Sequence, residues 1–123
     1  MTLVYVAGQY TDGGTLPRWK RWINYFIAMH HSYQLRKMGY GVFSPICNTP
    51  EELFYRTDKN VDYKLFVNFD LRILKHCHVI YLLPSWKDSK GARRELAYAN
   101  ELGLLAVYSL TGMRCLAKAS GGF

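Results

Sequence analysis

Near its amino terminus the sequence contains the apolar stretch Leu3-Val4-Tyr5-Val6-Ala7, which is followed by Gly8. A short apolar run that stops at a glycine is typical of a buried strand leading into a turn. A similar run from Val79 to Leu83 predicts another buried strand further along the chain. These two runs suggest the centre of a sheet, around which the rest of the chain is placed.

Helical patterns separate these runs from two further predicted strands. The clearest helix covers 18–38, where apolar side chains recur at three- and four-residue spacing, Pro17 suits the first turn and Gly39 supplies a stop. The polar stretch after the second strand predicts a loop with a helical turn. Further helices are predicted over 61–76 and 89–103, strands over 3–7, 40–46, 79–83 and 104–109, and a short helix with a loose end in the tail, 111–123.

The alternation of strands and helices favours right-handed crossover connections and therefore a parallel sheet. We predict a three-layer α/β fold of the Rossmann or flavodoxin type, with about four parallel strands in the order 2-1-3-4. A length of 123 residues fits one domain, 1–123, and a composition that is 50% hydrophobic argues against disorder.

The composition also limits the ligands and the compartment. A formal charge of +7, from 16 Lys and Arg against 9 Asp and Glu, favours anionic ligands, either phosphates on a small molecule or nucleic acid. Cys47, Cys77 and Cys115 are odd in number and widely separated, so we expect buried free thiols and no metal site. The apolar runs are too short to span a membrane, and no signal-like leader precedes the first strand, so we expect a cytoplasmic protein.

In an open parallel sheet, ligands bind beyond the carboxyl ends of the strands, near the point where the strand order reverses. This rule points to two loops, 8–14 and 84–91, which are rich in Gly, Ser, Thr, Asp and Lys. The second loop opens a helix, whose free N–H groups favour a phosphate or a carboxylate. Neither loop is a Walker loop or a dinucleotide-binding fingerprint.

Two acidic residues lie on the predicted helices near this crevice. Glu95 follows the expected helix cap, Ser89, by six residues, so its side chain can project toward the crevice. Asp70 has the apolar neighbours Phe69 and Ile73, and a partly buried carboxylate needs a partner or a function. Two convergent carboxylates suggest glycosidic chemistry.

Each acid also has a structural interpretation. A lone glutamate on a helix is usually a solvated surface residue. Asp70 forms a structural ion pair if Arg72, Lys75 or Arg94 lies beside it. Ser89 is expected to cap its helix in either case.

The residues of this crevice resemble the nucleoside 2-deoxyribosyltransferase-like superfamily. The resemblance extends over most of the chain and is carried by Gly8-Gln9-Tyr10, by Asp70-Leu71, and by Ser89-Lys90-Gly91 followed by Glu95 and Tyr98-Ala99. The chain looks most like small phage and bacterial members of uncharacterised function, and is more distantly similar to the deoxynucleoside 5′-monophosphate N-glycosidases. It departs from these relatives at His78, where they usually carry Asp, and in having no fifth strand after Ser109.

The resemblance implies a glutamate nucleophile and no cofactor or metal. Glu95 matches the nucleophile, which attacks C1′ of deoxyribose and displaces the base to leave a covalent glycosyl-enzyme. Water or another base then completes the turnover. Asp70 matches the second acid, which positions the sugar or protonates the departing base. The resemblance also implies a bacterial or phage-infected cell as the setting.

The substrate-binding residues follow from the same resemblance. Ser89 and the Gly91 N–H match a phosphate-binding turn, and Tyr10 would line the sugar site. Gly8 and Gln9 belong to the same predicted site. We also place Trp86 there, because a loop tryptophan beside the crevice either stacks on a base or packs against the protein.

Three functions compete at this point. The first is an N-glycosidase or deoxyribosyltransferase acting on a nucleoside or its 5′-monophosphate, and the second is a non-catalytic nucleotide-binding protein that sequesters or senses its ligand. The third is nucleic-acid binding through exposed basic residues, which we do not expect because no recognised motif supports it. The basic residues concerned are Arg18, Lys20, Arg21, Arg36, Lys37, Arg93 and Arg94.

The first long helix also predicts the assembly. Its aromatic residues recur at helical spacing, which is typical of core or of a helix-to-helix surface, and we expect an isologous homodimer. Its histidines, His30 and His31, accompany basic residues that include Arg21, and together they are expected on a solvated face. The aromatic residues are Trp19, Trp22, Tyr25 and Phe26.

Overall fold

The computed structural model describes residues 1–54 and 63–119, with side chains from residue 68 onward in the second stretch. The strands are β1 (Leu3–Ala7), β2 (Gly41–Phe43), β3 (Val79–Leu82) and β4 (Leu105–Val107). The helices are α1 (Arg18–Lys37), α2 (Pro45–Asn48), α3 (Tyr63–Lys75), α4 (Lys90–Leu102) and α5 (Leu110–Ala119), with 3-10 turns η1 (Pro50–Leu53) and η2 (Trp86–Asp88).

The four strands form one parallel sheet in the order β2-β1-β3-β4, which confirms the predicted fold class. Val4 of β1 lies opposite Val42 of β2 on one side and Val79 of β3 on the other. The edge strand β4 pairs with β3, with Leu105 opposite Val79. Helical segments between successive strands return the chain to the start of the next strand, as parallel pairing requires.

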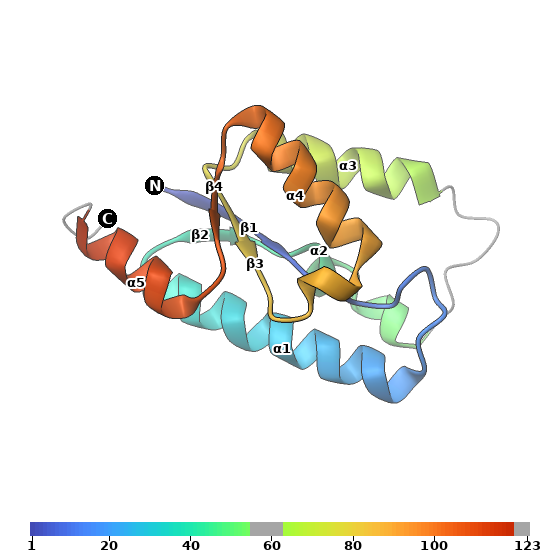
Figure 1. The fold of residues 1–123 in the computed structure, drawn as a ribbon. Helices are drawn as coiled ribbons and strands as arrows, with labels where there is room; N and C mark the ends of the chain where they lie inside the picture. Colours follow the sequence, from blue (N-terminus) through green and yellow to red (C-terminus); the bar gives the residue numbers. More distant parts are fainter. Residues whose placement is uncertain (55–62, 120–123) are drawn as a thin grey trace.

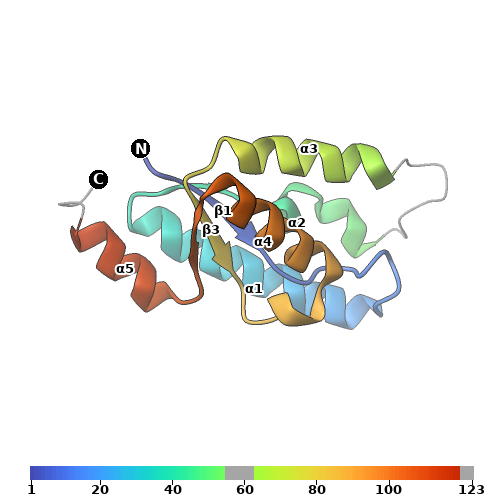
Figure 2. The same cartoon turned by 45° about the horizontal axis from the view of Figure 1, so that its top comes forward.

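The helices cover both faces of the sheet and make three layers (Figure 1, Figure 2). Alternate residues of β1 point to opposite faces, so Val4 and Val6 pack with α1 and α5 while Tyr5 and Ala7 pack with α3 and α4. All four are at most 1% exposed. The predicted buried strand is therefore apolar throughout because both of its faces are core.

The second strand is shorter than predicted. The chain leaves the sheet after Phe43, and Ser44 caps α2 by accepting a hydrogen bond from the Cys47 N–H at 3.3 Å. Pro45 occupies the first turn of α2, where its missing N–H costs nothing. The apolar Ile46, which had extended the predicted strand to 46, is instead buried as part of this helix.

Helix α1 begins where it was predicted and ends one residue earlier, at Lys37, but the face that it buries is not the aromatic one. Trp19 and Phe26 are exposed, whereas Arg21, predicted on a solvated face, is only 5% exposed. Small residues on the buried face let α1 lie close to the sheet, and Arg21 and Asn24 donate to carbonyls of loops and turns. The buried residues of α1 are Arg21, Asn24, Ala28, Ser32 and Leu35.

The fourth strand is also shorter than predicted, Leu105–Val107 in place of 104–109, and the other elements agree with small shifts. Ser89 caps α4, and the helix ends at Gly103, whose φ of 77° is left-handed. The predicted tail helix is α5. The predicted start of α3 at 61–62, and the tail beyond 119, lie outside the described residues.

The three cysteines are free, as expected, but only Cys77 is buried; Cys47 is half-buried and Cys115 exposed. Among the described residues, no helix combines the length and apolarity that a membrane crossing needs.

Candidate active site

Glu95 lies in the second turn of α4, on the side that carries the buried residues Ala92 and Ala99. Its half-buried carboxylate accepts a hydrogen bond from the hydroxyl of Tyr5, which rises from the middle of β1. The Tyr5 ring is 0% exposed. The contact joins residues 90 positions apart and fixes one carboxylate oxygen against the sheet.

Burial raises the pKa of Glu95 from 4.5 to about 8, because an ionised carboxylate loses its water there. The Tyr5 hydrogen bond acts in the opposite direction and lowers this pKa, since the hydroxyl stabilises the ionised form. The negative charge of Asp70 raises the pKa further, and Arg94 lowers it. The side chain is therefore an acid whose ionisation is poised close to neutral pH.

Asp70 lies on α3, four residues before the buried Leu74, so it faces the same side of the sheet as Glu95. Burial raises the pKa of Asp70 to about 6, and the charge of Glu52 adds to that rise. Among the described residues, none of the three basic candidates for a structural ion pair contributes to this pKa. Asp70 therefore adds a second carboxyl of raised pKa to the region around Tyr5.

The charges of Glu95 and Asp70 also act on the Tyr5 phenol, whose pKa is raised well above its usual range, mainly by burial. Three ionisable groups from β1, α3 and α4 therefore share one poorly hydrated region. Such a cluster is typical of active sites, where carboxyl pKa values are set by the surroundings.

An aromatic wall stands beside these groups. The Phe43 ring, at the end of β2, lies 5.7 Å from the Tyr5 ring and 6.4 Å from the Phe69 ring, measured between centroids. Phe69 precedes Asp70 on α3 and is 49% exposed. The wall gives the carboxyl groups an accessible apolar neighbour.

The loops after β1 and β3 meet, as expected for the carboxyl ends of adjacent strands. Gln9 is buried between them: its N–H donates to the Ser85 hydroxyl at 3.2 Å, and its side-chain amide donates to the Asp88 carbonyl at 3.3 Å. Gly8 is needed for this approach, because a Cβ there would lie 2.6 Å from the Cδ1 of Leu83. Both predicted site residues thus hold the two loops together.

The other predicted substrate residues have different surroundings. Tyr10 turns to the α1 side of the sheet, where its hydroxyl donates to the Thr49 carbonyl at 2.8 Å. Trp86 packs against the α4 side of the core, with its ring 5.7 Å from that of Tyr108. Tyr10 is therefore on the opposite face from Glu95, and Trp86 is held mainly by packing.

Ser89 acts as the predicted helix cap, with its hydroxyl accepting from the Ala92 N–H at 3.1 Å. The hydroxyl hydrogen stays available as a donor, because this bond uses only a lone pair. Gly91, in the first turn of α4, is half-buried, and a Cβ there would contact only Ser89. This turn keeps room and donors for an anion.

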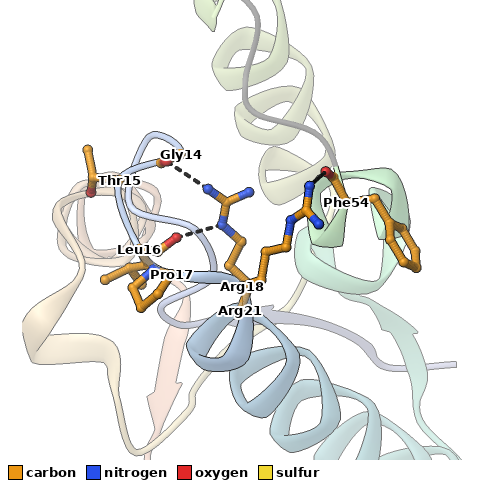
Figure 3. A pocket seen from close by; sticks show the side chains of 7 residues that line it. All are labelled: Gly14, Thr15, Leu16, Pro17, Arg18, Arg21 and Phe54. Carbon is orange, nitrogen blue, oxygen red and sulfur yellow. Dashed lines mark hydrogen bonds between the residues drawn. The ribbon is translucent and has the colours of Figure 1, made fainter.

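A cavity of about 350 Å³ opens at the start of α1, where it is lined by the loop that precedes the helix and by Phe54 (Figure 3). The buried guanidinium of Arg21 donates to the carbonyls of Leu16 at 2.8 Å, Gly14 at 2.7 Å and Glu52 at 3.1 Å. Arg18 donates to the Phe54 carbonyl at 3.1 Å. These guanidinium donors bind backbone carbonyls, so their role here is to hold the loop before α1 in place. We therefore do not assign a ligand to this cavity.

Sequence reasoning missed Tyr5, Phe43 and Phe69. Tyr5 lies inside the run that predicted a buried strand, and only the pairing of β1 with distant parts of the chain brings its hydroxyl to Glu95. One signal was available: a tyrosine in a strand buried on both faces needs a partner for its hydroxyl.

Among the described residues, no group of three or more His, Cys, Asp and Glu side chains is arranged to hold a metal ion. Comparison with curated proteins finds no match to the chain. A family model, described as a domain of unknown function (DUF4406), matches residues 2–108. This range includes the whole sheet together with Tyr5, Asp70 and Glu95. The chain belongs to the DUF4406 family.

Proposed function

We propose that this protein cleaves the N-glycosidic bond of a (deoxy)nucleoside or its 5′-monophosphate, by hydrolysis or by transfer to another base, with Glu95 as nucleophile. The observation that carries the proposal is the Tyr5-bound carboxylate of Glu95 with a second carboxyl, Asp70, in the same poorly hydrated region. The resemblance to nucleoside 2-deoxyribosyltransferases, noted from the sequence, supports the same assignment.

The chemistry balances with these groups alone. The Glu95 carboxylate attacks C1′, forming an ester as the bond from C1′ to the base nitrogen breaks, and protonated Asp70 gives its proton to the departing base. Water then attacks C1′ of the glycosyl ester and gives a proton to Asp70. The sugar leaves, and the Glu95 carboxylate is regenerated. In transfer, a second base attacks in place of water. Tyr5 keeps one carboxylate oxygen fixed throughout.

The region around the acids fits the parts of such a substrate. The exposed ring of Phe69 offers a surface on which a base or sugar can stack. The first turn of α4, with Ser89 and free N–H groups, favours a 5′-phosphate, as does the net charge of +7. We therefore favour a monophosphate over the free nucleoside.

A second candidate function has one observation in its favour. A carboxyl whose pKa is raised to about 8 is mostly protonated at neutral pH, and a protonated Glu95 is a poor nucleophile. The same region would then bind a nucleotide without cleaving it, as a sequestering or sensing protein does. Ligand binding without release of a base distinguishes this function from the enzyme.

The test is incubation with the four common 2′-deoxynucleosides and their 5′-monophosphates, followed by chromatography of the free bases. We expect release of base by the wild type, and none by Glu95→Gln, which keeps the shape but loses the anion. Glu101→Gln, on the exposed part of α4, is the matched control and should retain wild-type activity. Base release by Glu95→Gln at the wild-type rate would contradict the assignment.

The dependence on pH adds a second readout. Cleavage needs the singly protonated pair in the form that has the proton on Asp70 and an ionised Glu95. Because the pKa values are about 6 for Asp70 and about 8 for Glu95, most of that proton lies on Glu95 and the productive form is the minor one. The rate should still fall on both sides of about pH 7, where the singly protonated pair is most populated. The assay should cover pH 5 to 9, which runs from about three units below the raised pKa of Glu95 to about one unit above it. If the wild type binds nucleotides but releases no base at any of these pH values, the non-catalytic function is favoured.

The phosphate site has its own variant. Ser89→Ala removes one donor from the first turn of α4, so it should weaken binding of a monophosphate more than binding of the matching nucleoside. Isothermal titration of both ligands measures the difference. Equal losses for the two ligands would place the phosphate elsewhere.

A further inference from the structure

The outward face of α1 carries a row of large apolar side chains, which we name the α1 stripe. Its residues are Trp19, Ile23, Phe26, Met29 and Tyr33, with exposed fractions of 65%, 48%, 51%, 44% and 57%. They lie opposite the face that α1 buries against the sheet. A helix normally turns its apolar face to the core, so an exposed one points to a partner surface.

The centre of the stripe is held in place by neighbouring rings. The Phe26 centroid lies 5.6 Å from that of Trp22 and 6.3 Å from that of Tyr25. Trp22 in turn meets Phe54 edge to face at 5.5 Å. A surface that is already ordered loses little side-chain entropy when it is covered.

The spacing of the stripe is symmetric about Phe26. Ile23 and Met29 lie three residues before and after it, and Trp19 and Tyr33 lie seven before and after it. An antiparallel copy of α1, related by a two-fold axis at Phe26, therefore sets Phe26 against itself, Ile23 against Met29 and Trp19 against Tyr33. This is the self-complementary pattern of an isologous interface.

The apolar area fits the same partner. Side chains of this size present roughly 150–250 Å² when fully exposed, so five that are about half exposed offer on the order of 500 Å². A standard interface buries about 800 Å² on each partner, of which about 65% is apolar in homodimers. The stripe therefore supplies about the apolar area that one side of a homodimer needs.

The charges of α1 lie at its ends. From Trp22 to Leu35 the helix has no Asp, Glu, Lys or Arg, and its exposed basic residues are Arg18 at the start, and Arg36 and Lys37 at the end. An uncharged centre suits contact with a second copy. The like-charged ends face each other in the antiparallel pair, so salt should strengthen the association by screening them.

We propose that the α1 stripe is the interface of an antiparallel, two-fold symmetric homodimer of this chain. Helix α1 covers the face of the sheet opposite to that of Glu95 and the Tyr5 ring, and the stripe lies on the outward side of α1. The interface therefore does not depend on the proposed function.

The first test is sedimentation velocity of the full chain from about 0.1 to 100 µM, a range in which interfaces of this size associate. We expect a dimer, and we expect Phe26→Glu to weaken it at least about 30-fold, as for a central interface residue that meets its own copy. Leu105→Glu is the matched control, since Leu105 is 50% exposed on β4, away from the stripe. A wild type that is monomeric over the whole range overturns the proposal.

The second test fixes the register. Ile23→Glu combined with Met29→Lys sets opposite charges face to face across the axis, whereas Ile23→Glu combined with Met29→Glu sets like charges there. We expect the first double variant to dimerise at least about tenfold more tightly than the second. Equal weakening of the two overturns the antiparallel register, and circular dichroism confirms that both variants fold.

The response to salt distinguishes a homodimer from other partners of an apolar face with basic ends. Dimerisation should hold or strengthen between about 0.05 and 0.5 M NaCl, whereas binding to vesicles with phosphatidylserine or to duplex DNA weakens as salt rises. If the wild-type chain does not dimerise but binds such vesicles or duplex DNA, and Phe26→Glu loses that binding, the stripe is the binding surface for that partner instead.

Discussion

Tyr5 acts on Glu95 through a single hydrogen bond, and this bond favours the ionised carboxylate that the proposed chemistry needs. Burial pushes in the other direction and dominates, which leaves the pKa of Glu95 at about 8. A buried tyrosine beside this half-buried glutamate is therefore more than a packing contact, because its hydrogen bond increases the share of the carboxylate that is ionised at neutral pH.

Replacing Tyr5 by Phe should raise the pKa of Glu95 above about 8, because the ring stays in place while the donor to the ionised form is lost. A carbon-detected NMR titration of the Glu95 carboxyl measures this directly, without any assumption about activity. Base release at neutral pH should fall in parallel.

Tyr81→Phe is the matched control for this change. Tyr81 is buried on β3, and its hydroxyl lies 2.7 Å from the Nδ1 of His31 on the α1 side of the sheet. Tyr81→Phe should leave the titration of the Glu95 carboxyl unchanged. If Tyr5→Phe leaves it unchanged as well, the Tyr5 hydrogen bond has no part in setting the pKa of Glu95.

The sequence predicted Glu95 and Asp70 as site residues but not the groups around them. Asp70 was visible because its apolar neighbours would partly bury it, and Glu95 because of its spacing from Ser89 and the family resemblance. The surroundings depend on which strands become neighbours, and on which face of each strand meets which helix. Phe43, for example, gains its place beside Tyr5 and Phe69 only through the pairing of β1 with β2.

At the scale of elements, periodicity predicted where α1 begins and ends but not which way it faces. Its apolar residues gave a helical repeat, and a helical repeat usually marks the buried side. Here the sheet-facing side instead holds Ala28 and Ser32, which allow close approach, with Asn24, which donates to the Tyr10 carbonyl at 3.0 Å. The orientation of α1 thus follows the loop carbonyls that Arg21 and Asn24 bind. The periodicity of apolar residues carries no information about these carbonyls.

Arg21 makes the same point in energetic terms. Arg21→Ala should lower the free energy of unfolding by about 3 kcal/mol, because it removes charged donors from three carbonyls in a buried site. Urea denaturation measures the loss. Arg21→Lys should not restore it, since an ammonium lacks the planar fork that reaches several oxygens at once.

The neighbouring Arg18 supplies the comparison. It is exposed and donates to one carbonyl, that of Phe54, so Arg18→Ala should change stability by no more than about 0.5 kcal/mol. Similar losses in Arg18→Ala and Arg21→Ala would mean that burial of the guanidinium adds nothing. Because Arg21 also holds the backbone of Glu52, whose charge raises the pKa of Asp70, Arg21→Ala should in addition disturb the acidic limb of the pH profile.

In the molecule as a whole, the two faces of the sheet have different roles. Helices α3 and α4 cover one face of the sheet, and α1 and α5 cover the other (Figure 2). The first face holds the carboxyl groups; the second packs against Tyr10 from the loop after β1, and its helix α1 presents the α1 stripe. Helix α5 lies beyond the residues that match the family, yet Met113 is 0% exposed and its carbonyl accepts from the Tyr40 hydroxyl at 2.7 Å. The tail helix is thus part of the core on the α1 side.

The raised carboxyl pKa values also make the stability of the whole molecule depend on pH. Glu95 binds its proton more tightly in the folded protein, with a pKa of about 8, than in an unfolded chain, where the pKa is close to 4.5. The folded state therefore carries more protons between these values, and the free energy of unfolding should fall as pH rises from about 4.5 to about 8. Asp70 adds to the fall below about pH 6.

Glu95→Gln should remove most of this fall above about pH 6, because an amide keeps the shape and the Tyr5 contact without a charge to desolvate. The variant should then be more stable than the wild type at pH 9, about one unit above the raised pKa, although it is inactive. Thermal unfolding of both proteins between about pH 5 and 9 measures the two slopes. Glu101→Gln, exposed on the same helix, should keep the wild-type slope. Parallel curves for the wild type and Glu95→Gln would mean that Glu95 ionises in the folded protein as easily as in water, and would remove the raised pKa on which the predicted alkaline limb of the pH profile rests.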